Sequence, residues 1–215
     1  MLTLLLGLAP ANPLDAWGPH VGVGTLALNP NVYRDADGGT ELQAIVGCGM
    51  TRRFDVQVAA ATGLPEGAPA VPGPLELLPR WFVADGVGLV LKGVWLPGTT
   101  RLGPEVHLTQ PVGMSFEAYV DGGGAWGWRD GQGAPDQAFL VAGLEWVAPP
   151  KLRPYLESHT EAVAGEATAL FLTPGVYLLL DDAGAHELSA GVRTPMVGGR
   201  PAVAGVWYNR NLALR

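Results

Sequence analysis

The stretch KLRPYLESHTE, residues 151–161, alternates between two kinds of side chain at every second position. One parity is polar or ionisable and consists of Arg153, Tyr155, Glu157, His159 and Glu161. The other parity is uncharged and consists of Leu152, Pro154, Leu156, Ser158 and Thr160. Successive side chains of a β-strand point to opposite faces, whereas a helix would scatter them around its circumference. The stretch therefore predicts a strand with one face suited to water and the other to lipid.

The composition favours an all-β protein. The chain has 215 residues, with 31 glycines, 19 prolines and 7 tryptophans, and only 15% of its residues are charged. This mixture is typical of many short strands and turns, and it lacks the charged faces that soluble helices present to water. The mean hydropathy of +0.20 is high for a soluble protein. The length allows one large all-β domain or two small ones, and it suffices for a sizeable closed barrel.

Charge and cysteine content exclude several classes of protein and site. The net charge of −7 argues against a nucleic-acid-binding protein, which would need a basic surface to neutralise phosphates. The single cysteine, Cys48, allows neither an intramolecular disulfide nor a cysteine-based zinc site, and we expect it to be a small apolar filler. No uninterrupted apolar run of about 18 residues occurs, so no transmembrane helix is expected. A membrane could then be crossed only by a closed barrel.

The first twenty residues are predicted to be a separate N-terminal segment, and residues 21–215 a single barrel domain. Residues 1–8 form a short apolar run, and Ala9-Pro10-Ala11 follows it like the small-residue cleavage site of a secretory signal. The segment has no Lys or Arg before its apolar run. It is therefore either a signal peptide or a hydrophobic N-terminal stretch that is not a signal, such as an incomplete gene start.

The alternation extends along the chain and predicts about twelve strands of the length that a tilted membrane-spanning strand needs. They are expected near residues 21–34, 41–50, 54–63, 75–84, 87–96, 104–111, 114–127, 137–148, 151–161, 168–180, 185–195 and 200–210. Tight turns, such as Asp85-Gly86 and Pro149-Pro150, are predicted to alternate with longer loops over 35–40, 64–74, 97–103, 128–136 and 162–167. Short turns on one rim and long loops on the other are typical of outer-membrane barrels, and an even strand number places both ends of the barrel on the short-turn rim.

The charged parity is assigned to the inside of the barrel, because Lys or Arg facing lipid at the bilayer midplane costs about 2–4 kcal/mol. We predict that a lumen or solute path is lined by Arg80, Lys92, His107, Glu117, Asp121, Glu145, Arg153, Tyr155, Glu157, His159, Glu161, Glu187 and Arg193. Further acidic residues on the same parity are Glu41, Asp55, Glu76 and Glu105. Arg153 and Arg193 could pair with Glu157, Glu161 or Glu187 across this space, and such pairs could plug it.

Aromatic residues near the strand ends are predicted to mark the two membrane interfaces. This set consists of Trp81, Trp95, Trp126, Trp128, Trp146 and Tyr208. Trp81 and Trp146 lie close to predicted tight turns, whereas Trp95, Trp126 and Trp128 lie close to predicted long loops. The alternative is that the tryptophans fill the core of a soluble β-sandwich.

Three segments near the end of the chain resemble a known family. They are LTPGVY at 172–177, ELSAGVRTP at 187–195 and VAGVWY at 203–208. Together they resemble the C-terminal three strands of bacterial outer-membrane proteins of the transporter-like phenol-degradation MetA-pathway family. The resemblance is confined to these strands. It implies an outer-membrane β-barrel, with a channel for small hydrophobic or aromatic molecules as the expected function.

No catalytic, metal or cofactor site is expected. Ser158 and His159 are adjacent, so they point to opposite faces of a strand, and the histidines have none of the spacings of zinc ligands. The segment Asp35-Ala36-Asp37-Gly38-Gly39 lacks the later bidentate glutamate of a calcium loop.

The sequence therefore predicts a non-enzymatic outer-membrane barrel that is porin-like and closed, with antiparallel up-and-down strands. Its expected partners are the lipid bilayer and a small-molecule solute, without nucleic acid. Two other interpretations stay open. One is a soluble or periplasmic barrel that binds an apolar ligand and has its apolar parity turned inward. The other is a plugged barrel with a structural role.

Overall fold

Twelve long β-strands make up almost all of the described chain. The computed structural model describes residues 21–129, 132–181 and 185–214. The strands are β1 (Thr25–Asp35), β2 (Thr40–Thr51), β3 (Phe54–Leu64), β4 (Val71–Ala84), β5 (Val87–Leu96), β6 (Thr99–Val112), β7 (Phe116–Arg129), β8 (Gln132–Trp146), β9 (Leu152–Val163), β10 (Ala169–Leu179), β11 (His186–Val197) and β12 (Val203–Ala213). The described part of the chain has no helix that is long and apolar enough to span a membrane.

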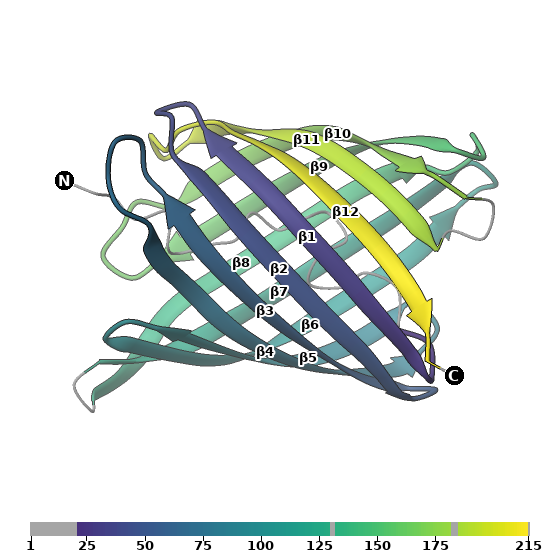
Figure 1. Cartoon of the computed structure of the whole chain (residues 1–215), viewed down its shortest axis with the longest axis horizontal. Coiled ribbons are helices and arrows are strands. Elements are labelled where there is room, and N and C mark those ends of the chain that lie inside the picture. Colours follow the sequence, from purple (N-terminus) through teal and green to yellow (C-terminus); the bar gives the residue numbers. More distant parts are fainter. Residues whose placement is uncertain (1–20, 130–131, 182–184, 215) are drawn as a thin grey trace.

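The strands form one closed barrel. Each strand pairs antiparallel with the strands next to it in sequence, and β1 closes the sheet by pairing with β12 from Thr25↔Ala213 to Asp35↔Val203. Figure 1 shows β1 and β12 side by side across this seam, with all strands steeply tilted. The predicted fold, an all-β up-and-down barrel of about twelve strands, is confirmed. Closure leaves no free sheet edge, which is the condition for burying strands in lipid.

The connections on both rims of the barrel are short, and their lengths differ less between the rims than predicted. The terminal rim, where β1 starts and β12 ends, carries the connections 52–53, 85–86, 113–115 and 147–151. The opposite rim carries 36–39, 65–70, 97–98, 164–168 and 198–202. Both ends of the barrel lie on one rim, as predicted. The contrast between short turns and long loops is weaker than predicted, because residues 99–103 belong to β6 and β8 starts at Gln132 instead of residue 137.

Residues 99–103, which were predicted to be a loop, pair regularly as part of β6, although their composition resembles that of a loop. Thr100 pairs with Trp95 on one side and with Trp128 on the other. The reversal itself needs only Pro97-Gly98, and Gly98 has a positive φ of 78° that favours glycine. Turn-forming residues over 97–103 therefore mark a tight hairpin followed at once by strand.

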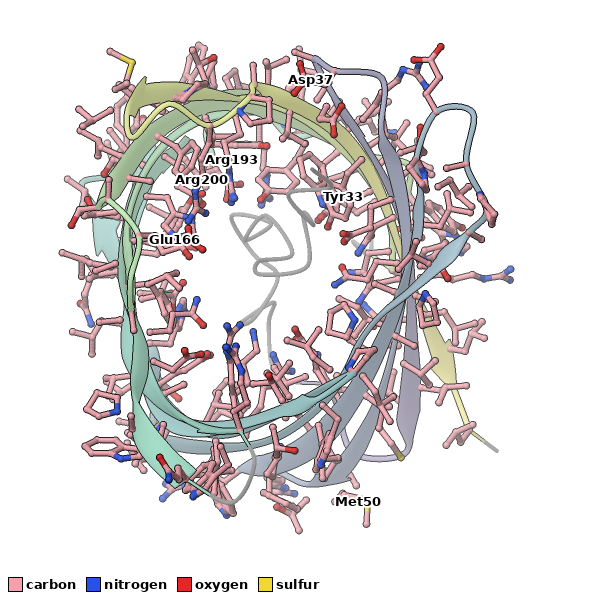
Figure 2. The ribbon with its side chains drawn as sticks, turned by 90° about the vertical axis from the view of Figure 1, so that its left-hand side faces the viewer. Tyr33, Asp37, Met50, Glu166, Arg193 and Arg200 are labelled. Atoms are coloured by element: carbon pink, nitrogen blue, oxygen red, sulfur yellow. The ribbon has the colours of Figure 1, made fainter. Side chains whose placement is uncertain are left out.

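The barrel is polar inside and apolar outside. The described interior has very little hydrophobic core, because the one cluster of buried apolar side chains consists of Leu78 and Val90. Buried polar side chains come from nearly every strand, whereas large apolar side chains are exposed on the outer face of every strand, among them Leu42, Val58, Leu77, Leu91, Val106, Val120, Leu144, Leu156, Val192 and Val206. Figure 2, a view into the barrel, shows Tyr33 and Arg193 pointing inward and Met50 pointing away.

Interior tyrosines lie flat against glycines of the neighbouring strand. Tyr119 on β7 pairs with Gly143 on β8, and Tyr155 on β9 pairs with Gly175 on β10. A Cβ atom on Gly143 would lie 2.1 Å from Cζ of Tyr119, and one on Gly175 would lie 2.1 Å from Cζ of Tyr155. These glycines therefore provide the space in which the rings pack against the barrel wall.

The variant Gly143→Ala is expected to lower the free energy of unfolding by about 1–3 kcal/mol, because the new methyl group overlaps the ring of Tyr119. Urea unfolding of the detergent-solubilised barrel, followed by tryptophan fluorescence, measures the change. The matched control is Gly122→Ala, since a Cβ at Gly122 meets its nearest neighbours at 3.5 Å and 3.7 Å, which is ordinary contact. Equal unfolding midpoints for the two variants would contradict the packing.

Candidate functional site: the barrel interior

Every side chain predicted to line the lumen lies on the inward parity of its strand. Nine are buried: Arg80, His107, Asp121, Glu145, Tyr155, Glu157, His159, Glu161 and Arg193. Four are partly exposed on the same faces: Lys92, Glu117, Arg153 and Glu187. The interior of the barrel is therefore the candidate functional site. The part that these residues play in a solute path stays a prediction.

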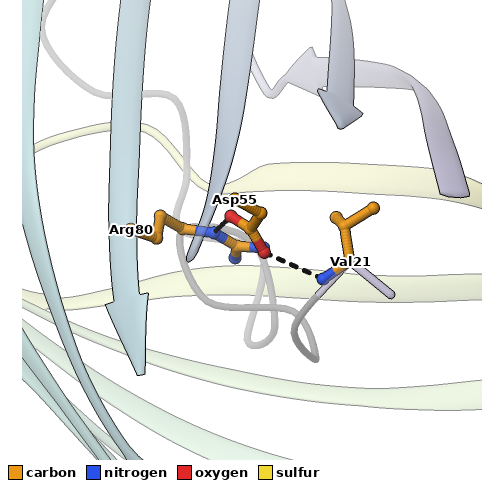
Figure 3. A network of polar contacts seen from close by, with 3 residues as sticks. All are labelled: Val21, Asp55 and Arg80. Atoms are coloured by element: carbon orange, nitrogen blue, oxygen red, sulfur yellow. Dashed lines mark hydrogen bonds and ion pairs between the residues drawn. The ribbon is translucent and has the colours of Figure 1, made fainter. Parts of the chain in front are cut away.

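The most deeply buried ion pair joins β3 to β4. Arg80 Nε donates to Asp55 Oδ1 at 2.6 Å and Arg80 Nη2 donates to Asp55 Oδ2 at 2.8 Å, with both side chains fully buried. The backbone N–H of Val21 donates to the same Oδ2 at 2.8 Å (Figure 3). Such a bidentate pair is fixed in geometry as well as in charge.

Residues 21–24 turn into the barrel instead of extending β1, which was predicted to start at residue 21. Val21 is buried, and Val23 forms an isolated parallel bridge to Gly49. A Cβ atom on Gly49 would lie 2.0 Å from the carbonyl oxygen of Gly22, so only glycine lets these backbones approach so closely. The turn and the Asp55 carboxylate together hold this part of the chain against the inner face of β2 and β3.

A cluster of acidic side chains lies on the inner face of β4, β5 and β6. Lys92 Nζ lies 3.2 Å from Glu76 Oε2 and 3.9 Å from Glu105 Oε1, so one cation serves two carboxylates. Further along β6, His107 contacts Asp121 through Nδ1 and Thr109 through Nε2. This part of the wall is rich in carboxylates.

The order Thr109, His107, Asp121 is that of a hydroxyl, imidazole and carboxylate in an acyl-transfer triad. Such a triad also needs N–H donors that stabilise the oxyanion. The backbone N–H of Thr109 is engaged, because it donates to the carbonyl of Gly86 at 2.7 Å. We therefore interpret the three side chains as a polar network that fixes the wall. Within the described residues, no group of three or more His, Cys, Asp or Glu side chains is arranged to hold a metal ion.

A second carboxylate-rich group lies near the terminal rim. Arg153 Nη1 lies 3.5 Å from Glu145 Oε1. Glu145 also pairs directly across the sheet with Glu117. Like charges directly opposite each other are unfavourable in a sheet, so water or the neighbouring guanidinium must screen them.

Aromatic rings and ionisable groups alternate on the wall formed by β7 to β11. Tyr119 Oη donates to Glu157 Oε2 at 3.1 Å. The ring of His159 lies edge-on between Phe139 and Phe171, at centroid distances of 6.3 Å and 5.9 Å. The guanidinium of Arg193 lies 5.2 Å from the centroid of Phe171.

The ion pairs differ from those predicted. Arg153 pairs with Glu145, and Glu161 pairs with Arg200 at 3.1 Å. The prediction considered Glu157, Glu161 and Glu187 as partners for Arg153 and Arg193. It missed Glu145, which meets Arg153 because the cross-strand register places Tyr155 opposite Glu145 and so brings Arg153 close to the end of β8. The charges of Arg193 and Glu157, and those of Arg153 and Glu187, do attract each other as predicted.

Three charged residues that form ion pairs in the interior were missed, namely Arg101, Asp136 and Arg200. Arg101 pairs with Asp136, and Arg200 also contacts Glu166 at 2.5 Å. Figure 2 shows Arg200 beside Glu166 at the mouth of the barrel. Arg101 and Asp136 lie in stretches predicted to be loops, although Arg101 continues the parity of Glu105, His107 and Thr109. Extending that alternation backwards would have found it.

The five tryptophans of the predicted interface set lie in two groups on the outer face. Near the terminal rim, Trp81 packs on Phe54 with centroids 5.0 Å apart, and Trp146 pairs with Phe116. Tyr208 lies midway along β12, away from both groups, and its hydroxyl is 2.9 Å from His186 Nδ1. Near the opposite rim are Trp95, Trp126 and Trp128. All five tryptophans are exposed, whereas Trp207 is buried inside and donates to Tyr33 Oη at 2.8 Å. Contact with a membrane interface stays a prediction.

Several solved outer-membrane barrels have similar structures. The NanC porin gives a TM-score of 0.68 at 8% sequence identity, covering 86% of this chain and 100% of that one. The KdgM porin in complex with disordered oligogalacturonate gives 0.66 at 6% identity, covering 86% and 98%. An outer-membrane channel from Pseudomonas putida F1 gives 0.62 at 10% identity, covering 91% and 98%.

These likenesses show that the chain has the fold of outer-membrane channel barrels. No protein-family model and no curated protein sequence matches the chain, so the predicted kinship with the MetA-pathway family stays a prediction. The similar barrels are named as porins and channels. That this protein is not an enzyme stays a prediction.

Proposed function

We propose that this protein is an outer-membrane channel for small solutes. The observation that carries the proposal is the inverted distribution of polarity, with charged side chains inside the closed barrel and large apolar side chains outside it. A closed sheet with an apolar outer face has every backbone group paired and suits a hydrocarbon environment. The inward-facing ionisable residues form the polar path through that environment.

The aromatic groups support the membrane location. Trp81 and Trp146 lie near the terminal rim, and Trp95, Trp126 and Trp128 lie near the opposite rim, so the apolar middle of the outer face is bounded on both sides. Tryptophan favours the boundary between lipid and water because its ring is apolar and its N–H can bond to water or headgroups.

The alternative of a soluble barrel with an apolar cavity requires the opposite arrangement of side chains. Its apolar parity would face inward, yet Leu156 is 51% exposed on the outside and Glu157 is fully buried inside. In water, the outer face would present an apolar surface far larger than the patches of ordinary soluble proteins. A plugged barrel shares the outer face of a channel and differs only in conductance.

The proposed solute path follows the polar interior, and the solutes are small and water-soluble. The resemblance of the last three strands to the MetA-pathway family would favour hydrophobic or aromatic molecules. The many charged groups of the interior favour solutes that keep their hydration shells, and the rings of the β7 to β11 wall add apolar contact.

Release of solutes from vesicles tests the proposal. The purified barrel, refolded into phospholipid vesicles loaded with a small sugar, should release the sugar, whereas the heat-unfolded protein should not. Folding is followed by the faster gel migration of the unheated barrel. Recovery in a soluble fraction without detergent would contradict the membrane location, and folded insertion without release would favour the plugged barrel.

A further inference from the structure

Carboxylates outnumber cations on the inner face of the described barrel. The inward-facing carboxylates are Glu41, Asp55, Glu76, Glu105, Glu117, Asp121, Asp136, Glu145, Glu157, Glu161 and Glu187. The Arg and Lys residues on the same inward parity are Arg80, Lys92, Arg101, Arg129, Arg153 and Arg193, and Arg200 points into the barrel from a connection. An interior with this imbalance carries a negative potential wherever water and ions enter it.

Five of these cations are already occupied by carboxylates, whereas the guanidinium of Arg193 lies over the ring of Phe171. Arg80 is held by Asp55, Arg101 by Asp136 and Arg153 by Glu145. Lys92 lies between two carboxylates, and so does Arg200. A passing anion would therefore compete with a resident carboxylate at each of these positions.

Four of these carboxylates form no ion pair within 4.0 Å with any residue that the structure describes, and three of the four, Glu41, Glu117 and Glu187, lie close to the two mouths. Glu41 is the second residue of β2 and lies near the opposite rim, where it is buried with Oε1 lacking a hydrogen-bond partner. Glu117 and Glu187 are the second residues of β7 and β11, near the terminal rim. Both entrances therefore carry carboxylates that none of the described ion pairs holds.

From this distribution we infer that the channel prefers cationic solutes over anionic ones, with neutral solutes between them. The inference rests on the proposed channel function and adds the charge class of the solute. Charges that line a narrow path with low-dielectric walls act strongly on ions, because the field is focused into the water that remains. The expected preference is opposite to that needed for a polyanion such as the oligogalacturonate bound to the KdgM porin.

The reversal potential of the channel in a planar lipid bilayer tests this inference. With a gradient of potassium chloride across the membrane, the zero-current voltage should have the sign of a potassium-permeable pore, giving a potassium-to-chloride permeability ratio above one. The double variant Glu117→Gln/Glu187→Gln should move this ratio towards one. Glu41→Gln, at the other mouth, should also move the permeability ratio towards one. This variant provides the test if the double variant does not fold.

The matched control is Glu66→Gln, which removes one carboxylate from the exposed connection 65–70 and should leave the ratio unchanged. A ratio at or below one for the unmodified channel would overturn the inference while the channel function stands. Unchanged ratios in the double variant and in Glu41→Gln would also overturn it. Absence of any current would instead contradict the proposed function.

Discussion

Replacing Asp55 by Leu is expected to lower the free energy of unfolding by about 3–5 kcal/mol, the cost of removing one partner from a buried ion pair. The guanidinium of Arg80 is fully buried and loses a bidentate carboxylate. The backbone N–H of Val21 loses its acceptor as well, so the inward turn of residues 21–24 should loosen together with the pair. Urea unfolding of the solubilised barrel measures the loss.

The double variant Asp55→Leu/Arg80→Leu should recover most of that stability, because replacing both members of a buried pair by apolar side chains is often neutral. A double-mutant cycle over these two positions isolates their coupling. If the single and double variants were equally destabilised, the pair would contribute little and the loss would belong to other contacts of Asp55.

An arginine in place of Leu156 should strongly impair folding into a bilayer. Leu156 lies within β9 on the outer face, between Leu144 and Pro174 of the adjacent strands, and is 51% exposed. If that face meets lipid, arginine near the midplane costs about 2–4 kcal/mol. The fraction folded into phospholipid vesicles, read from unheated gel migration over a urea series, measures this cost.

Leu152 provides the matched control because it is also 51% exposed but is the first residue of β9, close to the terminal rim. Leu152→Arg should cost about 0–1 kcal/mol, since the penalty for a cation falls towards the interface. Equal costs at the two leucines would mean that the outer face has no gradient from hydrocarbon to water, and would contradict a membrane-spanning barrel.

The fold could be predicted from sequence because one physical rule governs the whole chain. In β9, the alternation that starts at Arg153 and continues through Glu157 to Glu161 is the alternation of the strand itself, and the predicted and observed faces agree. A sheet that is wet on one side and apolar on the other repeats this pattern in every strand, so strand number and facing follow from it.

The pairing of side chains inside the barrel could not be predicted in the same way. Arg153 meets Glu145 and Arg200 meets Glu161 because of the register between strands and the path of a connection, and neither follows from alternation within one strand. Arg101 and Asp136 were missed because nearby glycines and prolines resemble loops, although the ladder continues through them. The flat packing of Tyr119 on Gly143 likewise depends on a cross-strand neighbour.

Single-channel recording in a planar lipid bilayer tests the central claim most directly. The refolded barrel, added to one side of the membrane in potassium chloride, should produce discrete current steps of uniform size, because ions pass through the polar interior of each inserted molecule. Heat-unfolded protein should produce none. Folded barrel that inserts into the bilayer and carries no current would contradict the account of the interior as a solute path.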